Sequence, residues 1–189
     1  MLKPFYQGKL DTFCAIYAVL NALRITHGIR TLKARDILND TLMGLASAPN
    51  ALRAVLDQTT DYCALVDGML RVQARAFPLR MEQPFGPQDS PTPEQLWLCC
   101  QHWLTAEAQR AVLFRFQRFI VPDGPPASRH WTVADKVANN ILHLFDCSHE
   151  AEAILNVRRD SFVTQLEDLS KERLLFIQPT TVHLLRPAY

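Results

Sequence analysis

The stretch from Cys14 to His27 constrains the fold most, because its pattern is helical and almost no polar face is left. Its apolar side chains recur at helical spacing, with small or aromatic residues between them: Ile16, Val19, Leu20, Leu23 and Ile25, and Tyr17, Ala18 and Ala22. A helix that is hydrophobic on nearly every side has to be covered by other elements. We therefore expect this helix at the centre of a domain, with Cys14 at its front end.

Further helices are indicated by capping residues on both sides of a proline-rich stretch. Gly28 is a plausible left-handed cap of the first helix, and Thr31 can begin the second. Ser47 before Pro49 indicates the start of a third helix. The segment 92–95 reads as a capping box with proline at the first helical position. This box predicts a helix that carries Trp97, Cys100, Trp103 and Leu104.

Strand-like alternation dominates after residue 110. The predicted strands cover residues 111–120, 130–137, 141–147, 174–178 and 181–185, and Asn139-Asn140 form the turn between the second and the third. An alternating pattern on both sides of Asp67-Gly68 also suggests an earlier hairpin. The segment 78–93, rich in proline, is expected to be irregular.

This order of elements predicts an α+β fold, in which helices come first and a mostly antiparallel sheet follows. With 189 residues, of which 48% are hydrophobic, the chain can bury one substantial core. We therefore expect a single domain over residues 1–189. Its helical part should cover about 1–60 and 92–108, and its sheet part about 110–187.

Charge and composition argue against several classes of protein. The formal net charge is only +1 and the two signs are mixed along the chain, so no nucleic acid is expected as a partner. No signal-peptide pattern and no apolar run of about 18 residues is visible, so no membrane association is expected. The five cysteines follow no disulfide-scaffold spacing. We therefore expect a cytoplasmic protein with reduced thiols.

Cys14 and His130 are candidates for a nucleophile and its base. An ordinary thiol ionises near pH ~8.5, so a catalytic cysteine needs surroundings that favour the thiolate. The unpaired amides at a helix start and a nearby imidazolium both do so. His130 would accept the thiol proton and later deliver it to a leaving amine. Such a pair would cleave an amide through a thioester on Cys14.

Two further residues complete this hypothesis. Asp146 lies sixteen positions after His130, enough for a strand, a turn and an antiparallel return that would bring the two side chains together. Asp135 should face the opposite side of its strand. Gln7 precedes the thiol and could donate its amide to an oxyanion, together with the backbone N–H of Cys14. Asp11 or Thr12 is expected to cap the nucleophile helix.

Gln7, Cys14, His130 and Asp146, in this order, resemble the papain-like cysteine peptidase superfamily. Within it the blocks at about 5–24 and 128–148 are most similar to bacterial peptidases that remove double-glycine leaders. The resemblance implies a helical lobe packed on an antiparallel sheet, with the site between them. It also implies that Cys14 is the nucleophile, His130 the base, Asp146 the orienting residue and Gln7 the oxyanion donor. The substrate would be a peptide or a protein.

Two alternatives to a hydrolase remain open. The same thioester could pass its acyl group to an amine, as in an acyltransferase or transglutaminase. Ala15 stands where the family has glycine after the nucleophile, and Gln7 lies one position farther from Cys14 than the family spacing. These departures leave room for a catalytically inactive papain-like domain that binds peptides.

No cofactor and no metal are expected. The chain has no phosphate-binding glycine loop, no metalloprotease helix signature and no serine elbow. Cys99 with His102, and Cys147 with His149, have spacings that could suit zinc. The adjacent Cys99-Cys100 pair and the absence of paired short cysteine spacings argue against that reading.

Overall fold

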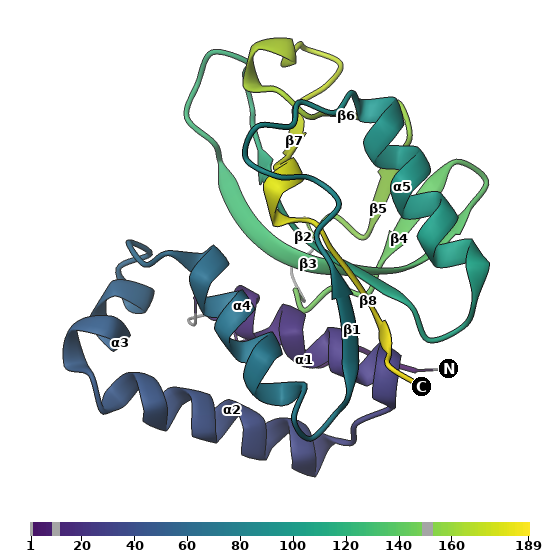
Figure 1. The fold of residues 1–189 in the computed structure, drawn as a ribbon. Coiled ribbons are helices and arrows are strands. Elements are labelled where there is room, and N and C mark those ends of the chain that lie inside the picture. The colour runs from purple at the N-terminus through teal and green to yellow at the C-terminus, as the bar shows by residue number, and fades with distance from the viewer. Residues whose placement is uncertain (1, 9–11, 149–152) are drawn as a thin grey trace.

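A computed structural model describes residues 2–8, 12–148 and 153–189 of the chain. These residues form five α-helices and eight strands, which makes the fold α+β, as the sequence predicts. Figure 1 shows α1 to α4 gathered below the sheet and α5 on its upper right. The helices are α1 (Cys14–His27), α2 (Thr31–Ala46), α3 (Pro49–Leu56), α4 (Tyr62–Gln73) and α5 (Pro93–Ala106).

The sheet is mainly antiparallel, in the order β1-β8-β2-β3-β4-β5. Strand β2 is its hub, because it pairs with β3 on one side and with β8 and β7 on the other. Only the short pair β6 with β7 runs parallel among the described strands. The strands are β1 (Leu79–Glu82), β2 (Ala111–Arg118), β3 (Ser128–Ala138), β4 (Ile141–Leu144), β5 (Asn156–Arg158), β6 (Phe162–Val163), β7 (Leu175–Ile177) and β8 (His183–Pro187).

Helix α1 lies in the centre of the helical part, as its composition requires. Ala15, Ile16, Val19 and Leu23 are all completely buried. They pack with residues of α2 and α4 and against one face of the sheet. Gly28 ends the helix in the left-handed conformation, with φ of 64°, and its N–H donates to the Arg24 carbonyl. Burial of the whole helix therefore fixes where Cys14, its first residue, can lie.

Alternating side chains of the sheet separate two cores. On β2, Ala111 and Leu113 face α1, whereas Val112 and Phe114 face α5. Strand residues alternate between faces, so one strand serves both layers. These four β2 residues are almost completely shielded from solvent. The sheet thus holds the helical part and α5 in fixed positions on its two sides.

The predicted hairpin around Asp67-Gly68 is wrong, because this segment forms helix α4. Asp61 caps the helix by accepting hydrogen bonds from the amides of Cys63 and Ala64. Val66, Met69 and Leu70 then point into the core at i, i+3 and i+4 spacing. A short segment of alternating apolar residues is compatible with a strand and with a helix. Here the helix forms because it packs against α1. The helical part therefore extends to residue 73, beyond the predicted limit of about 60.

Local turn and cap signals were predicted more reliably than pairing. The capping box of α5 is present, with Thr92 and Gln95 exchanging hydrogen bonds. Asn139 and Asn140 both adopt positive φ in the β3–β4 turn. The predicted last strand pair is corrected, because β7 and β8 both pair with β2 instead of with each other. The segment expected to be irregular contains β1, which pairs with β8.

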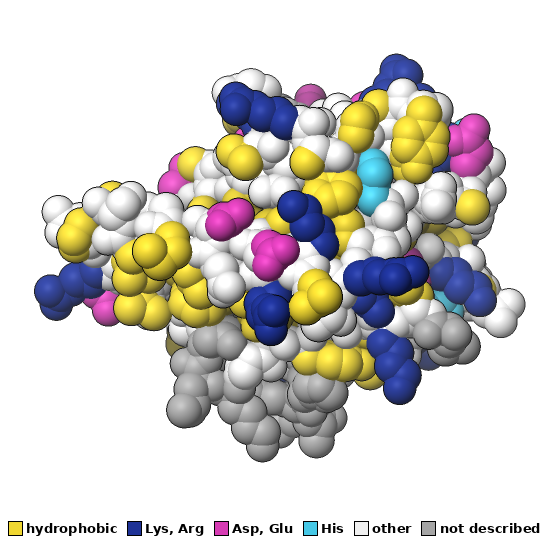
Figure 2. All heavy atoms as spheres, turned by 90° about the horizontal axis from the view of Figure 1, so that it is seen from below, with side chains coloured by type: hydrophobic (Ala, Val, Ile, Leu, Met, Phe, Trp, Pro, Cys, Tyr) yellow, Lys and Arg dark blue, Asp and Glu magenta, His cyan; other side chains and the backbone are white. Residues whose placement is uncertain are grey.

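The outer face of the helical part carries no dominant charge. Seen from below, hydrophobic, basic and acidic side chains are interspersed over the described surface (Figure 2). None of the helices in the described part of the chain is both long enough and apolar enough to cross a membrane.

Candidate active site

Cys14 is the first residue of α1, and its side chain is half-buried. The helix begins after Phe13, and the described residues show no side-chain cap hydrogen bond at this end. The expected Thr12 cap is wrong, because the Thr12 hydroxyl donates instead to the carbonyl of Val55, 3.3 Å away. The other expected cap, Asp11, lies outside the described residues. The amides at a helix start favour a negative charge, which suits a thiolate at this position.

His130 and Asp146 meet across the β3–β4 hairpin. His130 Nε2 lies 2.9 Å from one carboxylate oxygen of Asp146 and 3.2 Å from the other. Asp146 follows β4 by two residues, and the intervening amide of Phe145 donates to the Val133 carbonyl at 2.7 Å. This bond continues the alignment of the two segments beyond the regular ladder. The antiparallel return proposed from the sequence therefore brings these two side chains into contact.

Asp146 is held by two further donors. The Thr132 hydroxyl donates to its Oδ2, and the Ser148 amide donates to its Oδ1 at 2.7 Å. Both Thr132 and Asp146 are buried. The role of Thr132 was not predicted, although it stands two residues after His130 on one strand and so shares its face. These bonds hold the carboxylate in contact with His130, where it can orient the imidazole.

The charges of this pair stabilise each other. Burial alone would lower the pKa of His130, but hydrogen bonds to Asp146, Cys14 and Cys147 outweigh it and raise the pKa to about 12. For Asp146, burial acts to raise the pKa, but bonds from His130, Thr132 and Ser148 lower it below its ordinary value. At neutral pH the site therefore holds an imidazolium beside a carboxylate.

Cys14 and His130 line one pocket, with a volume of about 470 Å³. Cys14 is one of the hydrogen-bond partners that favour the protonated ring of His130. Since Nε2 is taken by Asp146, Nδ1 is the ring nitrogen left for the thiol. The structure thus places Cys14 of α1 and His130 of β3 in one pocket, and Asp146 contacts His130 from the segment after β4. The other residues of the pocket wall are Gln7, Thr12, Gln58, Tyr62, Arg115, Ala127, Ser128, Arg129 and Trp131.

Gln7 enters the same pocket from the segment before α1. The buried Asn21 holds this segment by accepting from the Phe5 amide at 2.7 Å and donating to the Phe5 carbonyl at 3.1 Å. The backbone N–H of Gln7 donates to the Cys147 carbonyl at 3.0 Å. The side-chain Oε1 of Gln7 accepts from the Cys147 thiol at 3.3 Å. The Nε2 group of Gln7 is thereby left without an acceptor among the described residues. It can donate to a ligand in the pocket.

Cys147 is a second thiol at the site, and sequence reasoning missed its position. Its Sγ lies 3.9 Å from His130 Nε2, and the side chain is buried. Burial raises the pKa of the Cys147 thiol to about 11, despite the opposing effect of His130. A buried, protonated thiol is a poor nucleophile. Cys147 therefore serves to orient Gln7, whereas Cys14 faces the pocket.

Volume alone does not locate this site. A larger cavity of about 720 Å³ lies between the start of α5 and the β3–β4 turn, and no cysteine or histidine lines it. Of residues 121–128, which lead from β2 to β3, only Ala127 and Ser128 line the described pocket. Gln58 and Tyr62 line another part of the described wall. That side of the pocket is formed around the start of α4.

Three described residues could in principle hold a metal ion. The ligand atoms of His130, Asp146 and Cys147 all lie within 4.8 Å of one another. His130 and Asp146, however, already satisfy each other, and Thr132 and Ser148 complete the carboxylate shell. This donor set is therefore explained by hydrogen bonding without an ion. The zinc reading of Cys147 with His149 cannot be followed, since His149 lies outside the described residues.

The charge of His130 predicts how stability depends on pH. A group with a raised folded pKa stabilises the fold fully below its unfolded value of 6.5, and this contribution is lost as pH rises toward about 12. His130→Gln should therefore lower the free energy of unfolding more at about pH 6 than at about pH 9. Urea unfolding at both pH values measures the difference. Equal costs would mean that the folded protein does not hold a charged imidazole here.

His102→Gln provides the matched control, because His102 is exposed on α5. This substitution should lower the free energy of unfolding only slightly at both pH values. Asp146 acts in the opposite direction: its lowered pKa contributes stability above its unfolded value of 3.8, and this is lost as pH falls further. Measurements above about pH 5 therefore isolate the His130 contribution.

Comparisons with known proteins leave the site to be judged on its geometry. No family model matches the sequence, and no curated protein is similar enough to count as a match.

Proposed function

We propose that the chain is a papain-like cysteine peptidase, which hydrolyses a peptide or isopeptide amide through a thioester on Cys14. The observation that carries the proposal is the joint placement of Cys14 and His130 in one pocket, with Asp146 bonded to the far side of the ring. The packing of the central helix α1 against an antiparallel sheet also fits that family. A thiol at a helix start, a base and an orienting group are the parts that nucleophilic catalysis requires.

The reaction follows from the charges of these groups. The Cys14 thiolate attacks the substrate carbonyl carbon, and the carbonyl oxygen becomes an oxyanion. His130, held as imidazolium by Asp146, gives its proton to the amine nitrogen as the C–N bond breaks. The now neutral ring takes a proton from water, and the resulting hydroxide attacks the thioester. Collapse of this second intermediate releases the acid and restores the thiolate and the imidazolium.

Gln7 is proposed as the oxyanion donor. Its Oε1 is occupied by the Cys147 thiol, so the Nε2 group is the end that can face the substrate. The backbone N–H of Cys14, at the start of α1, would supply the second donor. Losing one such donor typically costs roughly 3 to 4 kcal/mol of transition-state stabilisation. The Asn21 and Cys147 contacts hold Gln7 in place before substrate arrives, so the oxyanion donor is preorganised.

Selective alkylation of Cys14 tests the proposal. At about pH 6 an ordinary thiol is only ~0.3% ionised, so a thiolate kept by His130 should react with iodoacetamide on the order of 100-fold faster. Burial raises the pKa of each of the other four thiols, Cys63, Cys99, Cys100 and Cys147. Limited labelling followed by mass spectrometry should therefore find Cys14 modified first.

His130→Ala should remove this selectivity, because the thiolate loses its counter-charge. The matched control His102→Ala should keep it, since His102 is exposed on a different helix. Equally slow labelling of Cys14 in the wild-type protein would instead indicate a catalytically inactive domain.

A further inference from the structure

The pocket beside Cys14 is unusually rich in positive charge for a protein with a net charge of +1. Arg115, Arg129 and His130 line it, and none of its described lining residues is acidic. The His130 charge is already matched by Asp146. The guanidinium groups of Arg115 and Arg129 have no carboxylate partner among the described residues. They are the charges that a ligand could satisfy.

Arg115 lines this pocket, and its backbone is held by hydrogen bonds. Its backbone N–H donates to the Thr181 hydroxyl at 2.9 Å, and its backbone carbonyl accepts from the Gln178 N–H at 3.1 Å. On the other side, Arg115 is paired with Trp131, next to the pair of Phe116 with His130. These bonds fix the backbone one register position from the proposed base. The side chain is only half-exposed, so its charge is screened less than that of a surface arginine.

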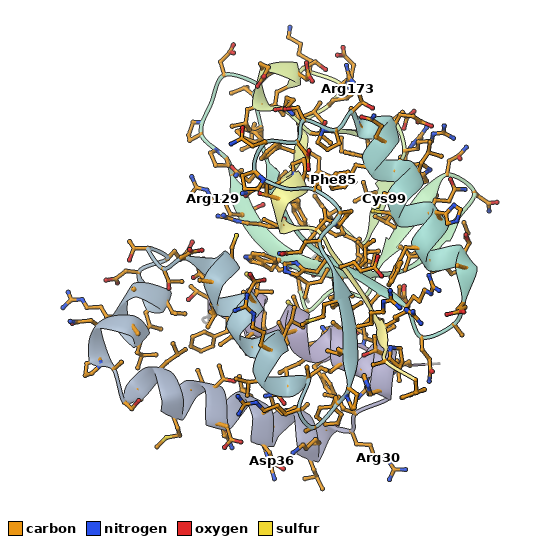
Figure 3. All side chains as sticks on the ribbon, viewed as in Figure 1. Arg30, Asp36, Phe85, Cys99, Arg129 and Arg173 are labelled. Carbon is orange, nitrogen blue, oxygen red and sulfur yellow. The ribbon has the colours of Figure 1, made fainter. Side chains whose placement is uncertain are left out.

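Tyr62 lies close enough to Cys14 and Arg115 for both to influence its pKa. Burial and Cys14 raise the pKa of the Tyr62 hydroxyl, and Arg115 opposes them. The same hydroxyl donates to the Val55 carbonyl at 3.0 Å, which fixes its place at the pocket wall. Both Cys14 and Arg115 are thus within electrostatic range of one fixed group. Arg129 adds a second guanidinium at the exposed rim, where Figure 3 shows it projecting from the sheet above the start of α4.

We infer that this peptidase prefers substrates with a carboxylate close to the scissile amide, and that Arg115 and Arg129 recognise it. This inference rests on the proposed function for the identity of the scissile bond, but the charge preference of the pocket can be measured separately. Guanidinium groups bind carboxylates through paired, charge-assisted hydrogen bonds. The carboxylate could belong to an acidic side chain or to a chain terminus.

Three matched chloroacetyl reagents test the inference and separate the two sources. N-chloroacetyl-glutamic acid α-amide carries a side-chain carboxylate, N-chloroacetyl-glutamine carries a terminal one, and N-chloroacetyl-glutamine amide carries none. All three release chloride as the Cys14 sulfur forms a thioether. We expect at least one charged reagent to alkylate Cys14 about five- to tenfold faster than the neutral one, and about 1 M salt to shrink that ratio. Mass spectrometry reports each rate at Cys14.

Substitutions of the two arginines test whether these residues cause the preference for charged reagents. Arg115→Gln and Arg129→Gln should each bring the ratio of charged to neutral rates closer to one, and Arg115→Lys should preserve most of it. Arg30→Gln is the matched control, since Figure 3 places Arg30 at the opposite end of the helical part. A ratio near one in the wild-type protein, or a ratio unaffected by both arginine substitutions, would overturn the inference. Slow reaction with all three reagents would instead count against the proposed function, while the ratio still reports the charge preference.

Discussion

Cys14→Ala should abolish peptide cleavage while the protein remains folded. The thiol is the only protein group in the proposed mechanism that bonds to substrate carbon, so its removal should lower kcat by at least ~10⁴-fold. Cys14→Ser should be nearly as inactive, because a hydroxyl is not ionised by this site. The side chain is half-buried at the first position of α1, where alanine is tolerated. Turnover of a peptide that the wild-type protein cleaves, followed with purified variants, measures the effect.

Cys99→Ala is the control for this experiment. Cys99 is also a half-buried thiol on a helix, but it lies on α5 and outside the pocket wall. Its loss should leave turnover close to that of the wild-type protein. Thermal unfolding of both variants checks that the fold is intact. Full activity of Cys14→Ala would rule out the thioester mechanism, and equal loss in both variants would point to a general effect on folding.

Asp146→Asn should reduce kcat by roughly 10²- to 10⁴-fold, with a smaller effect on substrate binding. The amide cannot supply the charge that keeps His130 protonated, and it can present an N–H where the ring needs an acceptor. The pKa of His130 should then fall from about 12 toward its ordinary value of 6.5. Steady-state kinetics report the first effect, and an NMR titration of the His130 ring reports the second.

Asp135→Asn makes the same chemical change on the same hairpin. Asp135 is exposed on β3 and is not a hydrogen-bond partner of His130 in the described structure. Neither kcat nor the His130 titration should change appreciably. The two readouts together separate an orienting role from a structural one, because a variant that is merely less stable would not move the ring pKa. An unaltered titration in Asp146→Asn would contradict the assignment of Asp146.

Features encoded within a few residues could be predicted from the sequence. Gly28 ends α1 because glycine tolerates the left-handed conformation, and Thr92 with Gln95 starts α5 through mutual hydrogen bonds. The hairpin mistake at Asp67-Gly68 has the complementary cause. Six to eight residues of mixed polarity fit a strand or a helix, and only the available partner surface distinguishes them. Here α1 offered that surface, so α4 formed.

For the candidate site, too, some features could be predicted from the sequence and others depended on packing. The order of Gln7, Cys14, His130 and Asp146 on a central helix and a late hairpin could be predicted, because hydrophobic periodicity and strand alternation fix which side chains share a face. The hydrogen bond of Thr132 to Asp146, that of Cys147 to Gln7, and the place of Arg115 in the pocket of Cys14 could not be predicted. Each of these contacts joins residues whose separation in space depends on packing between elements, and no local pattern carries that information. The sequence by itself therefore determined the candidate catalytic groups, and the tertiary structure decided what holds them and what charge surrounds them.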